Sequence, residues 1–310
     1  MTDPLVSVVV ISRDNERIIA RAVDAVLRQD TTFEFEVILA TSGTDGTARI
    51  VTERFPRVRV CEIDHPALPG EARNVGLRVA RGEYVAFVGA YTELLPGYLE
   101  VLAGRLGEGY SMVTGSMRNG TRTPAGWASY FLDNHGALPA RPSRELDQAP
   151  GRAAYARRAL VELGGFPEDR RTGEDTVVNN ELFARGYRAF RDAGMHSIHH
   201  TQCSTARVLA RHHFQRGRGM GRILAEQAER DGRVPDPRMR RFVTRNVERR
   251  LREVVRNVRE WGDGLRPTFW RVLPWVVLGA TSFWLGGCVE LALRVPGARR
   301  RVRTGAPAQR

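Results

Sequence analysis

The chain has 310 residues, of which 42% are hydrophobic, so it can bury the core of one large domain or of one domain with an appendage. Its cysteines, Cys61, Cys203 and Cys288, are odd in number and far apart, which indicates neither a disulfide framework nor a zinc site. The net charge of +13 is uneven, because residues 1–206 hold 24 arginines and 26 acids whereas residues 207–310 hold 24 arginines and 9 acids. The last third is therefore expected to face an anionic membrane surface or nucleic acid, and no nucleic-acid-binding motif accompanies its charge.

The first half of the sequence alternates short apolar runs with helical patterns. VSVVVIS at 6–12 is a continuous β-branched run, which is typical of a strand buried on both faces. An apolar stripe over 15–29 predicts the helix that follows it. Further strands are expected at 35–41, 58–63, 84–88 and 110–117, with helices between them. This alternation with short connections predicts an α/β fold with a mostly parallel sheet covered on both faces.

The middle of the chain holds one irregular segment and two helical patterns. Residues 117–150 are rich in Gly, Pro, Arg and Asn and lack periodicity, so we interpret them as a long functional loop. Residues 153–166 and 173–186 show helical patterns, and Glu174 and Asp175 stand at the expected N-terminus of the second one.

The pattern changes after residue 203. A helix with glycines near its middle is expected first, and residues 238–261 then place apolar side chains on one stripe and mostly arginine on the other face. Residues 272–289 contain no charge, but their length stands at the lower limit for a membrane span, and Pro274 and three glycines weaken it further. We divide the chain into an α/β domain at 1–203, a basic amphipathic helical segment at 204–266, and a hydrophobic, membrane-associated segment with an Arg-rich tail at 267–310.

Six segments carry a family resemblance, and in chain order they are VSVVVISRDNERIIARAVDAVLRQ, TDGTARIV, GEARNVGLRVARGEYVAFVGA, LLPGYLE, LVELGGFPE and GEDTVVNNELFARGYR. Together they resemble glycosyltransferase family 2, whose members use nucleotide sugars and have the GT-A fold. The sequence is most similar to the bacterial exopolysaccharide, succinoglycan-type branch, because STARVLARHHFQRGRG resembles the basic segment that follows the catalytic core there. The resemblance thus implies a GT-A domain with a C-terminal helical, membrane-associated region and a role in polysaccharide biosynthesis.

The resemblance also implies a divalent ion, Mn²⁺ or Mg²⁺, held by an Asp-x-Asp motif at the end of the strand YVAFV, where it would neutralise the nucleotide diphosphate. Here Gly89, Ala90 and Tyr91 stand at those positions, so both carboxylates are absent. We therefore assign no metal ligand and no cofactor, and expect arginines to supply part of the missing positive charge. The acids that bind the base in this family are also missing, since Thr41 stands in their turn, and Asp45 is expected to cap the next helix.

The acidic pair Glu174–Asp175 matches the catalytic position of the family. The resemblance implies that one carboxylate is the general base that deprotonates the acceptor hydroxyl, and we prefer Asp175. The alternative is that both acids only stabilise the N-terminus of a helix.

The remaining site residues are carried over by position. The resemblance implies contacts to the nucleotide sugar from Ser12, Glu16, Thr41, Arg73, Asn74, Gly89 and Tyr91, and contacts to the diphosphate or acceptor from Gln215, Arg216 and Arg218. Asn15 lies between the first two of these residues, at the end of the first strand. Structural alternatives remain open: Ser12 and Glu16 as a helix cap and a first-turn acid, and Arg73 on a solvated helix face.

These observations favour an inverting glycosyltransferase at the cytoplasmic face of the membrane, with a nucleotide-sugar donor and a lipid-linked or polysaccharide acceptor. The alternative is a catalytically inactive GT-A scaffold that binds a partner transferase or a glycan. The acidic pair favours the enzyme, and the uncharged turn at 89–91 favours the scaffold. Residues 238–295 are expected to attach to the membrane without crossing it, because a span over 272–289 would export the arginines of the tail.

Overall fold

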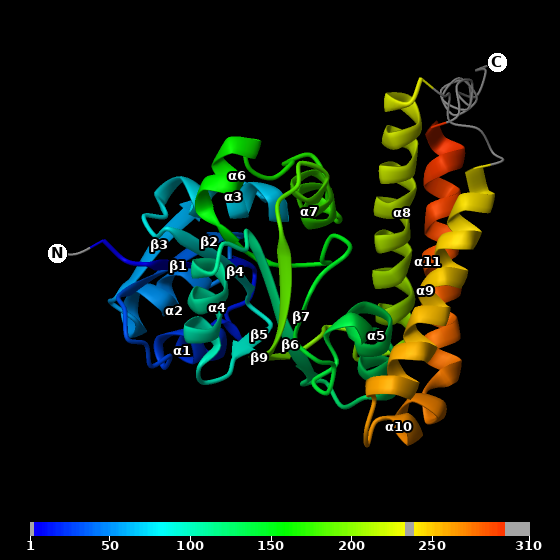
Figure 1. The fold of residues 1–310 in the computed structure, drawn as a ribbon, viewed down its shortest axis with the longest axis horizontal. Helices are drawn as coiled ribbons and strands as arrows, with labels where there is room; N and C mark the ends of the chain where they lie inside the picture. The colour runs from blue at the N-terminus through cyan, green and yellow to red at the C-terminus, as the bar shows by residue number, and fades with distance from the viewer. Residues whose placement is uncertain (1–2, 233–238, 295–310) are drawn as a thin grey trace, which may run out of the picture. The chain divides into compact units, whose positions relative to one another are not determined.

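The computed structural model describes residues 3–232 and 239–294, and the chain forms two compact units. The first, which we call the sheet unit, comprises Met1–Gly120 and Ala137–Thr201. The second, the helical unit, comprises Thr121–Gly136 and Gln202–Arg310. The chain therefore passes between the units three times, and an internal segment belongs with the C-terminal helices (Figure 1).

The sheet unit is built on four parallel strands in the order β3-β2-β1-β4. They are β1 (Val6–Arg13), β2 (Phe35–Ser42), β3 (Val58–Ile63) and β4 (Tyr84–Gly89). The sheet continues as β8, β6, β9 and β5 in mixed directions, and β7 pairs with β9. These strands are β5 (Thr92–Leu94), β6 (Met112–Asn119), β7 (Arg144–Glu145), β8 (Ala154–Ala156) and β9 (Ala189–His199). The predicted parallel half is thus extended by a mixed half.

Helices cover both faces of the sheet. Val8 and Val10 of β1 pack on one face with α1 (Ile19–Leu27), α2 (Thr47–Arg54) and α4 (Tyr98–Gly107). Val9 packs on the other face with α3 (Pro69–Val79), α6 (Arg157–Leu163) and α7 (Glu174–Ala184). All three valines are fully buried, so both faces of the strand need apolar side chains. The prediction from the continuous β-branched run is confirmed.

The prediction of a long loop at 117–150 is wrong, because this segment contains α5 (Pro124–Asn134) and a short 3₁₀ turn at His135–Ala137. Thr123 caps the helix by accepting the amide N–H of Gly126 at 3.1 Å. Eight residues of α5 are buried, so its sequence lacks the one-sided apolar period of a surface helix. The helix expected from residue 153 is also shorter, since strand β8 precedes it and α6 begins at Arg157.

The helical unit packs α5 with four further helices: α8 (Ala206–Arg230), α9 (Arg240–Trp261), α10 (Arg266–Arg271) and α11 (Leu273–Arg294). The backbones of α8 and α11 touch at glycines. A Cβ atom on Gly217 would overlap the carbonyl group of Phe283, and one on Gly286 would overlap the carbonyl group of Phe214. The glycines that interrupt the apolar segment therefore permit close helix packing.

A charged centre joins three helices of this unit. One carboxylate oxygen of Asp133, on α5, lies 3.2 Å from Nε of Arg216 on α8 and 3.1 Å from a guanidinium nitrogen of Arg250 on α9. Its other oxygen lies 3.2 Å from Nε2 of His212. Burial raises the pKa of Asp133, but Arg216 and the neighbouring cations outweigh this effect and hold the pKa well below its usual value. Burial lowers the pKa of the adjacent His213 to about 3, so this imidazole is neutral.

Asp133, His212 and His213 place ligand atoms within 4.8 Å of one another, as a metal site requires. However, the guanidinium groups of Arg216 and Arg250 already neutralise the carboxylate. A divalent ion would add charge to a region that is cationic without it, so we interpret the cluster as an ion-pair network that fixes α5.

Asp133→Asn is expected to destabilise the helical unit by about 3–5 kcal/mol, because it leaves the guanidinium group of Arg250 without its counter-ion. Since the pKa of Asp133 is depressed in the folded unit, its contribution is complete above about pH 4 and declines as the pH falls toward the folded-state pKa. The free energies of unfolding of wild type and variant should therefore converge in acid.

Urea unfolding followed by tryptophan fluorescence measures this unit alone, because all five tryptophans lie in it, namely Trp127, Trp261, Trp270, Trp275 and Trp284. The matched control is Asp263→Asn, which breaks an exposed pair with Arg266 and should change the free energy of unfolding by less than about 1 kcal/mol. Equal shifts of the urea midpoint in the two variants would contradict the role assigned to Asp133.

Candidate active site

The carboxyl ends of β1, β2 and β4 meet at one edge of the sheet. Ser12 of β1 pairs with Thr41 of β2, and Ile11 of β1 pairs with Gly89 of β4. The side chains of Ser12 and Thr41 are buried, and Gly89 is half-buried. Open α/β sheets hold ligands at this edge. The structure thus brings together three residues expected to contact the nucleotide sugar.

Two buried side-chain oxygens at this edge have no hydrogen-bond partner among the residues that the structure describes: Oδ1 of Asn15 and Oγ1 of Thr41. Asn15 is held in place because its amide group donates to Oγ of Ser12 at 3.0 Å and to the carbonyl of Arg13 at 2.8 Å. Buried polar atoms are nearly always hydrogen-bonded, so these two oxygens, one from the loop after β1 and one from the end of β2, indicate a place for ligand donors.

Carboxylates join the loops that follow β1 and β2. Asp14 accepts the amide N–H of Thr44 at 3.0 Å, and Glu16 accepts that of Gly46 at 2.9 Å. Asp45 accepts the amide N–H of Glu16 at 2.8 Å and that of Thr47, at the start of α2, at 3.0 Å. Asp45 thus contacts the first residue of α2, as expected, although the N-cap residue itself is Gly46. Glu16 is exposed and holds the second loop to the first.

The turn after β4 offers no set of metal ligands. Gly89, Ala90 and Tyr91 carry no carboxylate, and the next acid along the chain is Glu93. Oε1 of Glu93 lies 2.9 Å from Nε of Arg21 and 2.5 Å from Nε2 of His200. A side chain on Gly89 would meet nothing within 4 Å, so there is space at this position but no donor atom. The residues present do not fit the divalent ion that the GT-A fold commonly binds.

Glu174 is buried at the start of α7 and forms an ion pair with Arg73 of α3. Gly173, with φ of 86°, makes the turn that leads into α7. The guanidinium group of Arg73 lies over the rings of Phe87 and Phe166, with its carbon 5.9 and 5.2 Å from their centroids. Burial lowers the pKa of Arg73, but Glu174 and then Asp175 raise it above its usual value. The guanidinium group of Arg73 is therefore the ion-pair partner of Glu174.

Asp175 has a different environment from its neighbour. It is half-buried, and its Oδ1 accepts the amide N–H of Thr176 at 2.7 Å. Its Oδ2 makes no hydrogen bond or ion pair with any described residue. Glu174 is thus buried and paired with Arg73, whereas Asp175 is half-buried and forms no ion pair with a described residue.

Asn74 holds the segment before α7 to α3. Its amide donates to the carbonyl of Phe166 and to Glu168, both at 2.8 Å, and its Oδ1 accepts the amide N–H of Phe166 at 2.8 Å. Gly165, with φ of 84°, permits this approach, since a Cβ atom there would overlap Oδ1 of Asn74. Sequence reasoning missed this role, and the paired glycines at 164–165 were the one local signal of it.

Gln215, Arg216 and Arg218 belong to the helical unit. Arg216 pairs with Asp133, and Arg218 pairs with Glu290 of α11 at 2.8 Å. Gln215 is half-buried on the same helix. These two guanidinium groups are thus compensated within their own unit.

Residues 7–164, about half of the chain, match the family model Glycosyl transferase family 2. The chain belongs to glycosyltransferase family 2. Within it, 88 residues are 38% identical to the uncharacterized glycosyltransferase EpsJ of Bacillus subtilis (strain 168), a match that spans 27% of this chain and only 25% of EpsJ.

Solved structures agree with the GT-A fold. Mannosyltransferase PcManGT from Pyrobaculum calidifontis, solved with GDP-Man and Mn²⁺, superimposes with a TM-score of 0.59 at 20% identity, over 94% of this chain and 87% of that one. TarS 1–349 from S. aureus gives a TM-score of 0.54 at 16% identity, over 98% of this chain and 93% of that one. The predicted family and fold are confirmed.

Arg73→Met is expected to lower the free energy of unfolding by about 3–5 kcal/mol, because it leaves the carboxylate of Glu174 buried without its partner. Arg73→Met combined with Glu174→Gln should recover much of this loss, since no charge then remains to be buried. Urea unfolding followed by far-UV circular dichroism measures both. The control is Arg78→Met, an exposed position on the same helix. A double variant no more stable than Arg73→Met would contradict the pairing.

Proposed function

We propose that this family 2 glycosyltransferase transfers a sugar, with inversion, from a nucleotide-sugar donor to a hydroxyl group of its acceptor. The donor would lie at the strand edge where Asn15 and Thr41 present unpaired acceptors. Because α3 follows β3, its first turns stand at this same edge, and Arg73 brings the N-terminus of α7 there. PcManGT was solved with GDP-Man, and TarS with UDP and with UDP-GlcNAc, which supports a donor of this class.

The observation that carries the mechanism is the half-buried carboxylate of Asp175, whose Oδ2 has no partner among the described residues and which, unlike Glu174, forms no ion pair there. This oxygen accepts the proton of the acceptor hydroxyl, whose oxygen then attacks the anomeric carbon of the sugar. The bond from that carbon to the diphosphate breaks, and the nucleoside diphosphate leaves with the bonding electrons. Attack on the face opposite the leaving group inverts the anomeric centre.

We also propose that the enzyme works at the cytoplasmic face of a membrane, on a lipid-linked or polysaccharide acceptor. By length and composition α11 could cross a bilayer, and 44% of its most apolar stretch is buried within the protein. One side packs on α8 through glycines and carries Glu290, which is paired with Arg218 and Arg294. The other side exposes Val277, Trp284 and Leu285. A helix with one side packed on protein suits attachment in the plane of the membrane.

The second candidate is a GT-A scaffold that binds a glycan or a partner transferase without catalysis. The turn at 89–91 favours it, since no carboxylate there can hold a metal beside a diphosphate. A donor screen with UDP-, GDP- and dTDP-sugars separates the two, because a scaffold would release no nucleoside diphosphate.

Asp175→Asn is expected to slow transfer by about 10²- to 10⁴-fold, because the amide cannot accept the proton of the acceptor hydroxyl. The assay follows nucleoside diphosphate release with the donor selected by the screen. Glu181→Gln, on the same helix and outside the acidic pair, should leave the rate unchanged. An Asp175→Asn variant as active as the control would remove this assignment, and a wild type that turns over no donor would favour the scaffold.

Transfer is expected to continue in excess EDTA at a rate close to that without it, because Gly89 and Tyr91 supply no carboxylate for a divalent ion. The measurement compares initial rates in EDTA with rates in Mn²⁺ and Mg²⁺. Complete inhibition by EDTA, reversed by added metal, would show that other residues hold an ion.

A further inference from the structure

Six arginines form a row along α9, which we call the arginine stripe: Arg241, Arg245, Arg249, Arg252, Arg256 and Arg259. Their spacings of four and three residues keep them within a sector of about 80° at 3.6 residues per turn, over a length of about 27 Å. All six are exposed. The opposite side of α9 carries Val243, Val254 and Val258, which are buried. Packing within the unit thus uses one side of α9 and leaves the arginine stripe outside.

The arginines of the stripe have no partner among the described residues. None of the six side chains forms a hydrogen bond or ion pair there, and none of the acids beside them, Glu248, Glu253 and Glu260, forms an ion pair with a described residue. Other arginines of the unit differ, since Arg250, Arg218 and Arg222 pair with Asp133, Glu290 and Glu226. Among the described residues, the unit therefore pairs these arginines with acids and leaves the arginine stripe without counter-ions.

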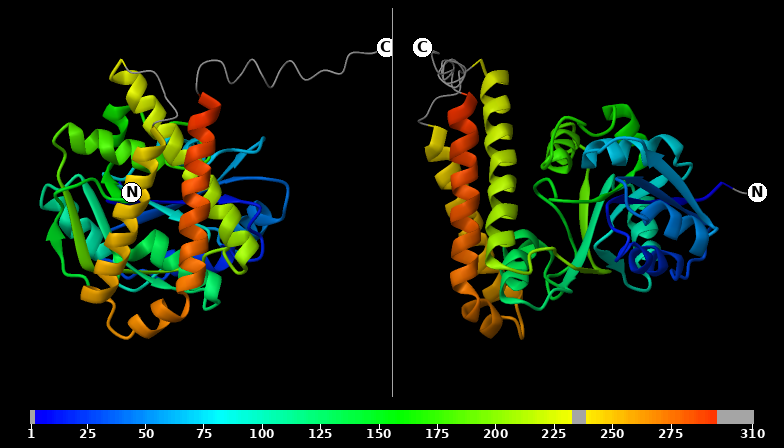
Figure 2. Two further views of the ribbon diagram at one scale, coloured as in Figure 1. Left: turned by 90° about the vertical axis from the view of Figure 1, so that its right-hand side faces the viewer. Right: turned by 180° about the vertical axis from the view of Figure 1, so that it is seen from behind.

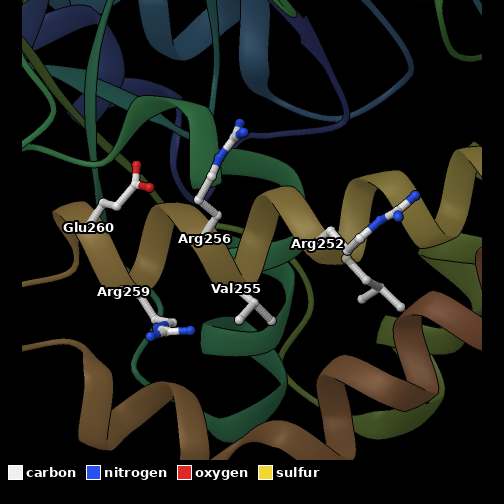
Figure 3. A pocket seen from close by; sticks show the side chains of 6 residues that line it. Arg252, Val255, Arg256, Arg259 and Glu260 are labelled. Atoms are coloured by element: carbon white, nitrogen blue, oxygen red, sulfur yellow. The ribbon is translucent and has the colours of Figure 1, made fainter.

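One part of the stripe borders a hollow of about 700 Å³ (Figure 3). It is lined by Leu251, Arg252, Val255, Arg256, Arg259 and Glu260. One guanidinium group can bind two phosphate oxygens at once, and the apolar side chains of Leu251 and Val255 beside the arginines suit a ligand that carries a hydrocarbon part.

An apolar surface adjoins the stripe. Helices α9 and α11 lie side by side, with α8 behind them in the left view of Figure 2. The exposed side of α11 carries Val277, Leu278, Trp284 and Leu285, at the spacing of one helical face. The indole N–H of Trp284 donates to Oγ1 of Thr244 on α9 at 3.0 Å, so this apolar row reaches the neighbouring helix.

We propose that the arginine stripe binds the phosphate groups of anionic phospholipids while the exposed row of α11 enters the lipid. This inference rests on the proposed membrane location and adds the surface and the lipid class. A soluble polyanion would also attract the arginines, but it has no hydrocarbon part that could bury the apolar row of α11 beside them. A bilayer supplies a plane of phosphate groups above hydrocarbon, which matches both rows.

The test measures binding of the full chain to vesicles of phosphatidylcholine alone and with phosphatidylglycerol added, by cosedimentation. Wild type should bind the anionic vesicles, and added salt should weaken this binding. Arg252→Gln/Arg256→Gln/Arg259→Gln should lower the partition coefficient about 100-fold, since each arginine near such a surface strengthens binding roughly fivefold. Circular dichroism establishes that the variant is folded.

The matched control is Arg54→Gln/Arg57→Gln/Arg59→Gln, which makes the same charge change at exposed positions of the sheet unit. Equal losses in the two triple variants, or equal binding of wild type to both kinds of vesicle, would overturn the proposal. So would binding of wild type to dextran sulfate with no binding to anionic vesicles, which would indicate a polyanionic chain. The assay uses neither donor nor acceptor, so a failure of the proposed transfer leaves its result unaffected.

Discussion

The buried ion pair between Arg73 and Glu174 is the constraint on which the candidate site depends. Its partners are 101 residues apart in the sequence and lie on α3 and α7. Two aromatic rings cover the guanidinium group, so water cannot replace either partner at low cost. Asn74 adds neutral hydrogen bonds one residue further along α3. Glu174 therefore has a structural role as the partner of Arg73. The next residue, Asp175, keeps its Oδ2 without a partner among the described residues.

The helical unit is also held together by a buried charged group, and in addition by close contacts between helix backbones. Its charged centre at Asp133 fixes the direction of α5 relative to α8 and α9, whereas glycines fix how closely α8 approaches α11. These contacts bury one side of α9 and one side of α11, so the other side of each helix is exposed. The arginines of this unit therefore include the paired ones of the charged centre, such as Arg216 and Arg250, and the row on α9 that has no partner among the described residues.

Local patterns in the sequence predict what is decided locally. Neighbouring residues decide the buried strand at 6–12 and its end at Ser12 beside Thr41. They also decide the contact of Asp45 with the start of α2. The partner of Arg73 does not, because it is set by tertiary packing. The helix α5 escaped prediction because burial on nearly all sides removes the period by which a helix is identified. The pairing of Arg216 and Arg218 was hidden for the same reason as that of Arg73, since their acids lie on other helices.

The position of α5 in the sequence also affects how the protein can be made. This helix is synthesised between β6 and β7 of the sheet unit, yet its partners α8, α9 and α11 come last. During synthesis, Trp127 and Phe131 therefore lack their final neighbours, such as Phe269, until the C-terminal helices have left the ribosome. For the same reason, cutting the chain after Thr201 would not yield an independent catalytic fragment, because the stranded helix would keep an aromatic surface that invites aggregation.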